Sequence, residues 1–512
     1  MCVAVLAAAV SMGGAVAAAG QEPVDQAVIA RIKTEGFQHS AVMDTLSWLS
    51  DVYGPRLTGS ANLHNAAVWA RDRMTHWGLE HAALEPYGSI GRGWDAGRFS
   101  IEMTEPQYMR ITGYPRAWSP AIESPIVGTP IVVDVRSKED FAKYHGKLRG
   151  AIVMNGRPEP RDIGFTPEAT RESDDDLKKL EGQIDPAAHG LKSYQDEEQE
   201  FVNYLKNLTD VWKFFGDEGV AALITPSPIP EDVRVDGFYD RAWRSPYPAF
   251  VISREHYGRI MRMLDRKVPV KLSLSLDARF TDNVEGYNVV AEIPGTDPAL
   301  ASQVVMLGGH LDSWHSGTGA TDNGAGSAVV MEAVRILKAI GVKPRRTIRV
   351  ALWTGEEQDY FGSVGYVEKH FGDLKTLALK PEHAKLAAYF NLDNGSGRIR
   401  GIDLQGNEAA RPIFEAWLAP FRYLGATTVS TLNTGGTDHM PFDALGLPGF
   451  QFIQDPLNYE TRVHHSNLDV YEEAQPDDLK QAAVIMASFV YDAAMRDQML
   501  PRKELPKGRP GS

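Results

Sequence analysis

Cysteine is almost absent from this 512-residue chain, whose single cysteine is Cys2. If residues 1–20 are removed as an export signal, no thiol remains. The mature chain then has no disulfide, offers no thiolate to a metal and is not a cysteine hydrolase. Any metal site must therefore be built from histidine, aspartate and glutamate.

Long hydrophobic runs are also missing. Residues 1–20 are small and apolar, and Ala15-Val16-Ala17 is typical of the cleavage site of a secretory signal. The usual basic start of such a signal is absent, because no lysine or arginine precedes Arg31. No segment matches the roughly 20 bulky apolar residues of a membrane span. We expect a secreted or periplasmic protein that does not span a membrane; the alternative for residues 1–20 is a helix of small residues in the folded protein.

Positive charge is in deficit, since the formal net charge is -14. A general nucleic-acid binder needs a basic surface that neutralises phosphates. The charge balance therefore argues against a nucleic-acid partner, but it does not identify the substrate, because a local pocket can have the opposite sign.

The sequence changes character along the chain in a way that predicts domains. With 512 residues, 43% of them hydrophobic, the chain has room for about two to four domains. Residues 21–87 have a helical spacing of apolar side chains, and a proline-punctuated block of short strands follows. After residue 281, strands alternate with helices, which predicts an α/β fold with a mostly parallel mixed sheet between helices. The expected boundaries are 1–20 for the signal, 21–119 for the N-terminal part of the larger domain, 120–280 for an inserted domain, 281–500 for the main part and 501–512 for a flexible tail.

Polar residues with metal-binding side chains stand at the ends of predicted strands. The runs 304–309, 350–353 and 387–390 lead into histidine or acidic residues. Ligands of open α/β sheets bind at the carboxyl ends of the strands, so these side chains should meet at one edge. One further acidic residue precedes a predicted helix, and a histidine pair precedes the last helix. The five ligand-type residues are His310, Asp322, Glu357, Asp393 and His465.

This set of side chains favours zinc. Without cysteine, zinc is bound by imidazole and carboxylate, and a catalytic zinc keeps one position for water. One ion needs about three such protein ligands, so five favour two ions about 3.5–4 Å apart, bridged by a carboxylate and a water. That water needs a base to take its proton. Each motif alone is weak, because His-x-Asp and Gly-Glu-Glu also occur in plain loops and helix starts; their joint placement makes the prediction.

The same segments resemble the dizinc exopeptidases, a family that includes secreted bacterial leucyl aminopeptidases and glutamate carboxypeptidases. The similarity is greatest to the plasma glutamate carboxypeptidase (carboxypeptidase Q) subgroup and covers nearly the whole mature chain, including Tyr53 to Ser60. The block 120–280 resembles the β-rich protease-associated domain inserted in several members. The motifs that carry the resemblance are residues 310–314, 352–354, 392–395 and 464–466.

The resemblance implies a role for each ligand-type residue and two zinc ions per chain. Asp322 bridges the ions, with a peptide bond to Asn323 that is expected to be cis. Glu356 is the general base, and Asp312 orients the ring of His310. By this resemblance, His310 and Asp393 complete one zinc site, and Glu357 and His465 complete the other.

Three further residues are assigned to the substrate side of the site. His464 stands where some relatives have a tyrosine that holds the oxyanion; it either donates a hydrogen bond there or is a structural neighbour. Asp438 and His439 lie in a Gly-rich loop that lines the substrate pocket in relatives, and a plain turn is the alternative.

The expected function is a zinc-dependent exopeptidase that hydrolyses dipeptides or terminal residues of peptides, with a metal-bridged hydroxide and a Glu base. Whether the substrate is held by its amino or its carboxyl end is left open, since neither a pocket acid nor a pocket base is evident. An inactive binding module and a one-zinc enzyme that cyclises N-terminal glutamine are the alternatives, and neither fits a complete ligand set well. The expected partner is a peptide, and a homodimer is left open.

Overall fold

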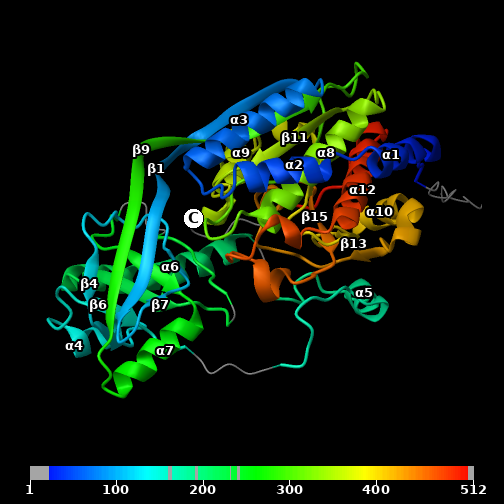
Figure 1. Cartoon of the computed structure of the whole chain (residues 1–512). Helices are drawn as coiled ribbons and strands as arrows, with labels where there is room; N and C mark the ends of the chain where they lie inside the picture. The colour runs from blue at the N-terminus through cyan, green and yellow to red at the C-terminus, as the bar shows by residue number, and fades with distance from the viewer. Residues whose placement is uncertain (1–21, 159–163, 191–193, 231, 239–242, 506–512) are drawn as a thin grey trace, which may run out of the picture.

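The computed structural model describes residues 22–158, 164–190, 194–230, 232–238 and 243–505 (Figure 1). The predicted signal, residues 1–20, and most of the predicted tail lie outside these ranges. Among the described helices, none has the length and apolar character required to cross a membrane.

A 10-stranded mixed sheet forms the centre of the larger domain, in the order β14-β13-β15-β12-β10-β11-β9-β1-β2, with β4 paired to β9 and with β2 (Met109–Arg110) at the far edge. Its central strands are parallel, as predicted, and antiparallel strands flank them. The sheet as a whole is therefore mixed rather than mostly parallel. The central strands are β10 (Val304–His310), β11 (Thr347–Trp353), β12 (Leu386–Asn391) and β15 (Gly449–Gln454), and β13 (Ile399–Asp403) and β14 (Thr428–Ser430) form one edge.

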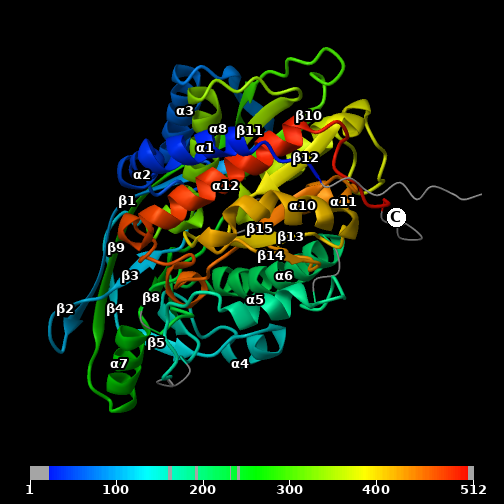
Figure 2. The ribbon, with the colours of Figure 1, turned by 90° about the vertical axis from the view of Figure 1, so that its right-hand side faces the viewer.

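Helices cover both faces of this sheet (Figure 2). In β10, Val305 and Leu307 pack into the core on one face, whereas Met306 packs into the core on the other. This alternation follows from the two-residue period of a strand, and burial on both faces explains why the central strands are mainly apolar. The first face is covered by α1 (Gln26–Gln38), α2 (Val42–Ser47), α3 (Ala61–His76), α8 (Ala325–Ala339), α10 (Arg411–Leu418) and α12 (Pro476–Met495), and the second by α9 (Phe361–His370) and α11 (Met440–Ala444).

A two-stranded ribbon connects the larger domain to a second sheet. It consists of β1 (Glu80–Glu105) and β9 (Lys271–Ile293), which pair antiparallel along almost their whole length. The helical prediction for residues 21–87 is therefore wrong from Glu80 onward, because those residues pair with β9. This pairing is non-local, and the sequence of β1 shows no regular alternation that would reveal it.

The second sheet has five strands in the order β3-β8-β7-β6-β5. Its residues fall within or near the predicted block 120–280, although β3 begins earlier. Helices pack with this sheet, so the inserted domain is α/β rather than β-rich, and its assignment as protease-associated stays a prediction. The elements are β3 (Gly113–Pro115), β4 (Ile126–Gly128), β5 (Pro130–Val133), β6 (Ile152–Asn155), β7 (Ala222–Pro226), β8 (Ala249–Ile252), α4 (Phe141–Tyr144), α6 (Tyr194–Glu218) and α7 (Arg254–Asp265).

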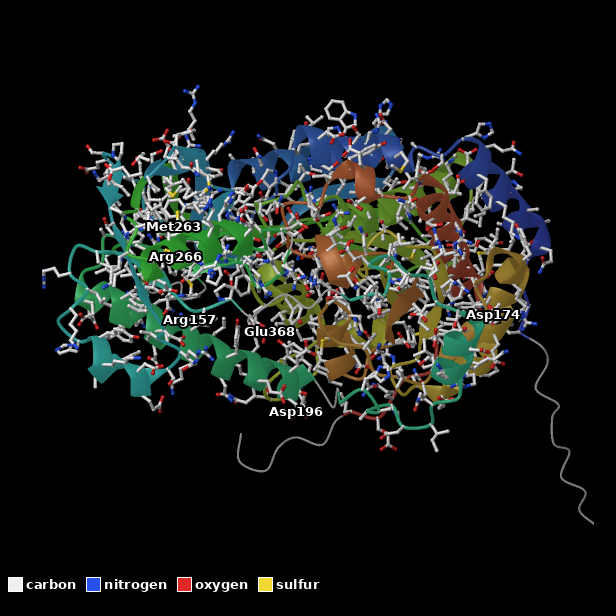
Figure 3. The ribbon with its side chains drawn as sticks, turned by 60° about the horizontal axis from the view of Figure 1, so that its bottom comes forward. Arg157, Asp174, Asp196, Met263, Arg266 and Glu368 are labelled. Carbon is white, nitrogen blue, oxygen red and sulfur yellow. The ribbon has the colours of Figure 1, made fainter. Side chains whose placement is uncertain are left out.

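Between β6 and β7 the chain leaves the second sheet and returns to the larger domain. The short helix α5 (Asp174–Glu181) lies there, and Figure 3 shows Asp174 far from Met263 of α7 and from Arg266, which follows that helix. Arg171 fixes this excursion, since its guanidinium lies 2.7 Å from both the Asp455 and the Asp478 carboxylates. The helix α6 then leads back to the second sheet, so the excursion spans both domains.

A fully buried arginine organises the loop behind the carboxyl edge of the large sheet. Arg56 donates hydrogen bonds to the carbonyl oxygens of Leu311 (2.6 Å) and Gly319 (2.7 Å). Its remaining bonds reach Leu49 (2.8 Å) and Thr318 (2.9 Å). Burial lowers the pKa of this guanidinium to about 10, although nearby acidic groups oppose the shift. The segment 53–60 thus acts as a clamp on the loop that follows β10.

We predict that Arg56→Met lowers the free energy of unfolding by at least about 3 kcal/mol, because four buried carbonyl oxygens lose their donor. Thermal unfolding followed by circular dichroism measures the change. Arg71→Met is the matched control: Arg71 makes only a partly exposed pair with Asp72, so its loss should cost less than about 1 kcal/mol. Equal shifts for both variants would contradict the clamp.

Candidate metal centre

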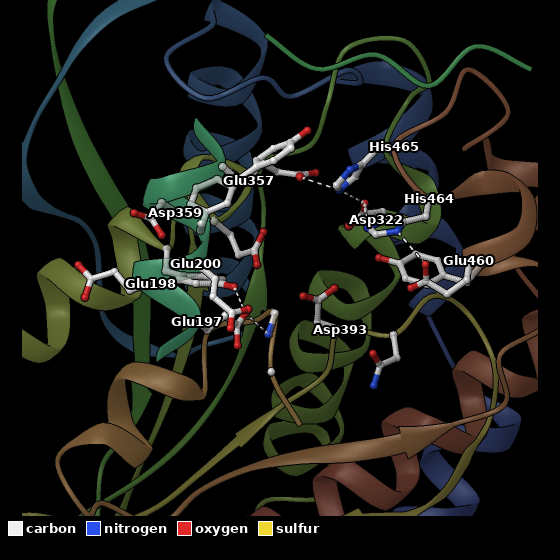
Figure 4. Close-up of a pocket in the computed structure, with 18 residues that line it drawn as sticks. Glu197, Glu198, Glu200, Asp322, Glu357, Asp359, Asp393, Glu460, His464 and His465 are labelled. Carbon is white, nitrogen blue, oxygen red and sulfur yellow. Dashed lines mark hydrogen bonds and ion pairs between the residues drawn. The ribbon is translucent and has the colours of Figure 1, made fainter. Parts of the chain in front are cut away.

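Four of the five predicted ligands line one cavity (Figure 4), and His310 lies beside two of them, Asp322 and Asp393. His310 is the last residue of β10, and Asp393 follows β12 by two residues. Glu357 lies in the short turn after β11. Asp322 lies just before α8, and His465 lies in the loop that precedes α12. Strand-end placement therefore works as predicted for three of the five, and the other two reach the same edge from loops.

Asp322 lies between the two histidines. Its Oδ1 is 3.3 Å from Nε2 of His310, and its Oδ2 is 3.2 Å from Nε2 of His465. Nε2 of His310 is also 3.4 Å from Oδ1 of Asp393, and Nε2 of His465 is 2.9 Å from Oε2 of Glu357. One carboxylate thus presents one oxygen to each half of the set, which is the arrangement of a bridging ligand. The Asp322–Asn323 peptide is cis, as expected.

These side chains fit cation binding. Oδ2 of Asp322 and Oδ1 of Asp393 are buried without a hydrogen-bond partner among the described residues. His310, Asp322 and Glu357 bring ligand atoms within 4.8 Å of one another. Burial, together with Asp322, raises the pKa of Glu357 well above its usual range. Buried carboxylates this close together repel one another, and a divalent cation removes that cost.

Asp312 lies against the His310 ring, and its role in orienting that ring stays a prediction. Nδ1 of His310 is 3.0 Å from the backbone oxygen of Asp312 but 3.7 Å from its carboxylate. The carboxylate instead accepts a hydrogen bond from Thr58 (2.7 Å) and from the backbone N–H groups of Glu356 and Glu357 (both 3.3 Å). Asp312 therefore holds the His310 ring through its main chain and the glutamate turn through its side chain.

A second buried carboxylate has the same task for Asp322. Asp469 accepts hydrogen bonds from the backbone N–H and the hydroxyl of Thr321 (2.6 and 2.7 Å) and from the N–H of Asp322 (3.1 Å). Burial raises the pKa of Asp469 to about 7. Asp469 follows the 464–466 motif by three residues, and no local pattern distinguishes it as a supporting residue.

The inserted domain supports the loop that carries His465. The N–H of Val233 donates to Oδ1 of Asn467 (2.7 Å), and the N–H of Asn467 donates to the oxygen of Val233 (3.1 Å). Arg234 and Ser466 form an isolated antiparallel bridge next to it. The position of one ligand therefore depends on contact between the two domains.

The three residues assigned to the substrate side fall into two groups. His464 lines the cavity: its ring stacks on Tyr459 with centroids 4.7 Å apart, and its Nε2 is 3.7 Å from Oδ2 of Asp322. Asp438 and His439 are fully buried and lie behind the wall, where Asp438 accepts a bond from Ser363 (2.5 Å). From their loop, Gly435 and Gly436 line the cavity instead.

Sequence reasoning missed one wall of this cavity, which has a volume of about 570 Å³. Glu197, Glu198 and Glu200 of α6 contribute to it, together with Tyr360 and Tyr459. In sequence, these glutamates belong to an acidic run, and such a run is most often a solvated surface. Only the path of the excursion, which no local pattern reveals, brings it to the metal centre.

Comparison with known proteins agrees with this geometry. A buried carboxylate–imidazole set at the carboxyl edge of an α/β sheet, within a segment that matches a peptidase model, defines a metallo-exopeptidase. Residues 288–490, which contain all five ligand-type residues, match the model of Peptidase family M28.

Relatives extend the similarity over most of the chain. Carboxypeptidase Q of Pongo abelii is 29% identical over 461 residues, which cover 90% of this chain and 86% of the relative. A peptidase M28 precursor from Shewanella amazonensis is 24% identical, with a TM-score of 0.66 over 94% of this chain and 99% of its own. A zinc aminopeptidase from Bacillus subtilis is 20% identical, with a TM-score of 0.58 over 89% and 95% of the two chains. The two structures support the fold.

We predict that Asn467→Ala weakens metal binding about 10- to 100-fold, because it releases the loop that positions His465. Titration of the metal-free protein against a competing chelator measures this without any assay of activity. Asn207→Ala, an exposed position on α6 bonded to the oxygen of Arg136, is the control and should bind metal like the parent. Unchanged affinity in Asn467→Ala would contradict the role of the domain contact.

Proposed function

We propose that the chain is a zinc-dependent exopeptidase acting on dipeptides or peptide ends, with two zinc ions bridged by Asp322. His310 and Asp393 would complete one site, and Glu357 and His465 the other. The observation that supports this most strongly is the position of Asp322, whose two oxygens face two different histidines at 3.3 and 3.2 Å. A single ion would leave one of these pairs without a function.

Zinc in these sites would polarise the peptide carbonyl and lower the pKa of a bound water, as it does in related hydrolytic centres. The chain's own groups supply the positioning and the proton transfer. Asp469 fixes the Asp322 backbone, and Asp312 fixes the turn that carries both glutamates. These bonds set the geometry on which hydrolysis depends.

Glu356 is the proposed general base. It is 9% exposed, lines the cavity, and its Oε2 is 3.9 Å from Nε2 of His310. It neighbours Glu357 in the chain but is not among the groups that face His465. Its carboxylate is placed to accept a proton from the attacking water and to return it to the leaving amine. His464, which also lines the cavity, is the proposed donor to the oxyanion.

The exopeptidase mode is supported by the shape of the site. The first turns of α6 lie along one side of the cavity, across from the histidines (Figure 4). A long peptide running through the site would have to pass this wall. A chain end or a dipeptide fits without displacing it.

We predict that Glu356→Gln keeps its metal and loses about 10²- to 10⁴-fold in kcat, because only the proton transfer is removed. His465→Ala should lose metal as well as activity. Metal content is measured by elemental analysis after dialysis, and activity by the hydrolysis of dipeptides.

Dialysis against a chelator should abolish hydrolysis by the parent protein, and added zinc should restore it.

The controls are surface residues of the same types. Glu368→Gln and His145→Ala change exposed side chains outside the cavity and should keep both metal and activity. If Glu356→Gln remains as active as Glu368→Gln, Glu356 is not the base. If the parent protein holds metal but hydrolyses no peptide, the substrate class is wrong.

A further inference from the structure

The helix α6 brings acidic side chains from outside the larger domain to the metal centre. Glu197, Glu198 and Glu200 from its first two turns line the cavity, opposite the histidines in Figure 4. None of these residues is a candidate ligand among the described metal-binding groups. They face the volume in which a substrate would lie.

The charge of this cavity has one sign. Apart from the ligand-type residues, the proposed base and His464, its ionisable lining groups are acidic except for three tyrosines, and no described lysine or arginine contributes. Asp359 and Glu460 extend the negative wall beyond α6. A free peptide carboxylate would be repelled here, whereas an ammonium group would be attracted.

Glu197 is the best positioned of these acids. Its Oε1 accepts hydrogen bonds from the Tyr360 hydroxyl (3.1 Å) and from the N–H of Gly436 (3.0 Å), both in the cavity wall of the larger domain. Its Oε2 is buried and has no hydrogen-bond partner among the described residues. A carboxylate fixed by one oxygen, with the other unsatisfied, is prepared for a cationic donor.

The path of the chain places this carboxylate near the reacting groups. Tyr360, which donates a hydrogen bond to Glu197, follows the proposed base Glu356 by four residues. Burial, together with the charges of both glutamates, raises the pKa of the Tyr360 phenol well above its usual range. Burial raises the pKa of Glu197, and a bound cation would offset that cost.

We propose that Glu197 is a specificity-determining residue that binds an ammonium group of the peptide substrate. The inference rests on the proposed peptidase function and narrows its substrate class. The ammonium group has two sources: the α-amino group of the first residue or the side chain of a lysine. In the first case the enzyme holds its substrate by the amino end and requires that end to be free.

The test measures binding separately from hydrolysis. In the Glu356→Gln background, with zinc present, calorimetry with Ala-Ala and with N-acetyl-Ala-Ala compares Glu197→Gln with its parent. Glutamine keeps an oxygen for Tyr360 and Gly436, so the fold should be retained. Asp210→Asn, on the same helix but paired with Lys138 at 2.9 Å, is the matched control.

We expect Ala-Ala to bind at least tenfold more weakly to Glu197→Gln, with no change for the acetylated peptide or for Asp210→Asn. A tenfold loss for N-acetyl-Lys-Ala but not for Ala-Ala would identify the lysine side chain as the ammonium source. Equal binding by Glu197→Gln and its parent, an equal loss for all peptides, or no binding of any peptide would overturn the proposal. Absence of hydrolysis by the wild-type protein would refute the peptidase function alone, since calorimetry still decides the role of Glu197.

Discussion

Six carboxylates that are buried around the carboxyl edge of the large sheet repel one another, and the surrounding groups offset this repulsion. The negative charges of Asp322, Glu357 and Asp393 can be neutralised by bound cations. Asp312 and Asp469 are stabilised instead by N–H and hydroxyl donors, and Glu356 remains on the cavity wall. Desolvated charges of one sign are tolerated only when each has such a partner. The acids that bound cations can neutralise are therefore the candidate metal ligands, and the acids stabilised by hydrogen-bond donors of the protein are the supporting residues.

The backbone around these acids is held by groups that carry no chemistry themselves. Arg56 binds carbonyl oxygens on both sides of the loop between His310 and Asp322. The inserted domain holds the loop of His465 through Val233 and Asn467. A centre built on loops from separate parts of the chain keeps its geometry only if those loops are fixed in this way. The inserted domain is thus part of the site as well as its cover, because it supports one ligand and supplies the α6 wall.

The clustering of the five ligand-type residues at one sheet edge could be predicted from the sequence, because two local signals coincide there. Apolar runs such as 347–353 are strands of the central sheet, and the strand-end rule places the residues that follow at one edge. The role of Asp312 could not be predicted, since a sequence does not tell whether its carboxylate or its main chain meets His310. The ribbon of β1 and β9 and the position of Glu197 could not be predicted either. Both depend on contacts between residues far apart in the chain.

The acidic wall shows how composition alone misleads. A run of glutamates in a chain of net charge -14 is most simply a solvated surface, and much of α6 is exposed in that way. The same helix has a few acids turned toward a buried centre, where charge has a much larger effect than at the surface.

The central claim is that Asp322 bridges two metal ions. Anomalous diffraction at the zinc edge from crystals of the zinc-loaded protein tests it directly. We expect two peaks about 3.5–4 Å apart, one beside His310 and Asp393 and the other beside Glu357 and His465, with an oxygen of Asp322 on each. A single peak, or two peaks that Asp322 does not join, would contradict it.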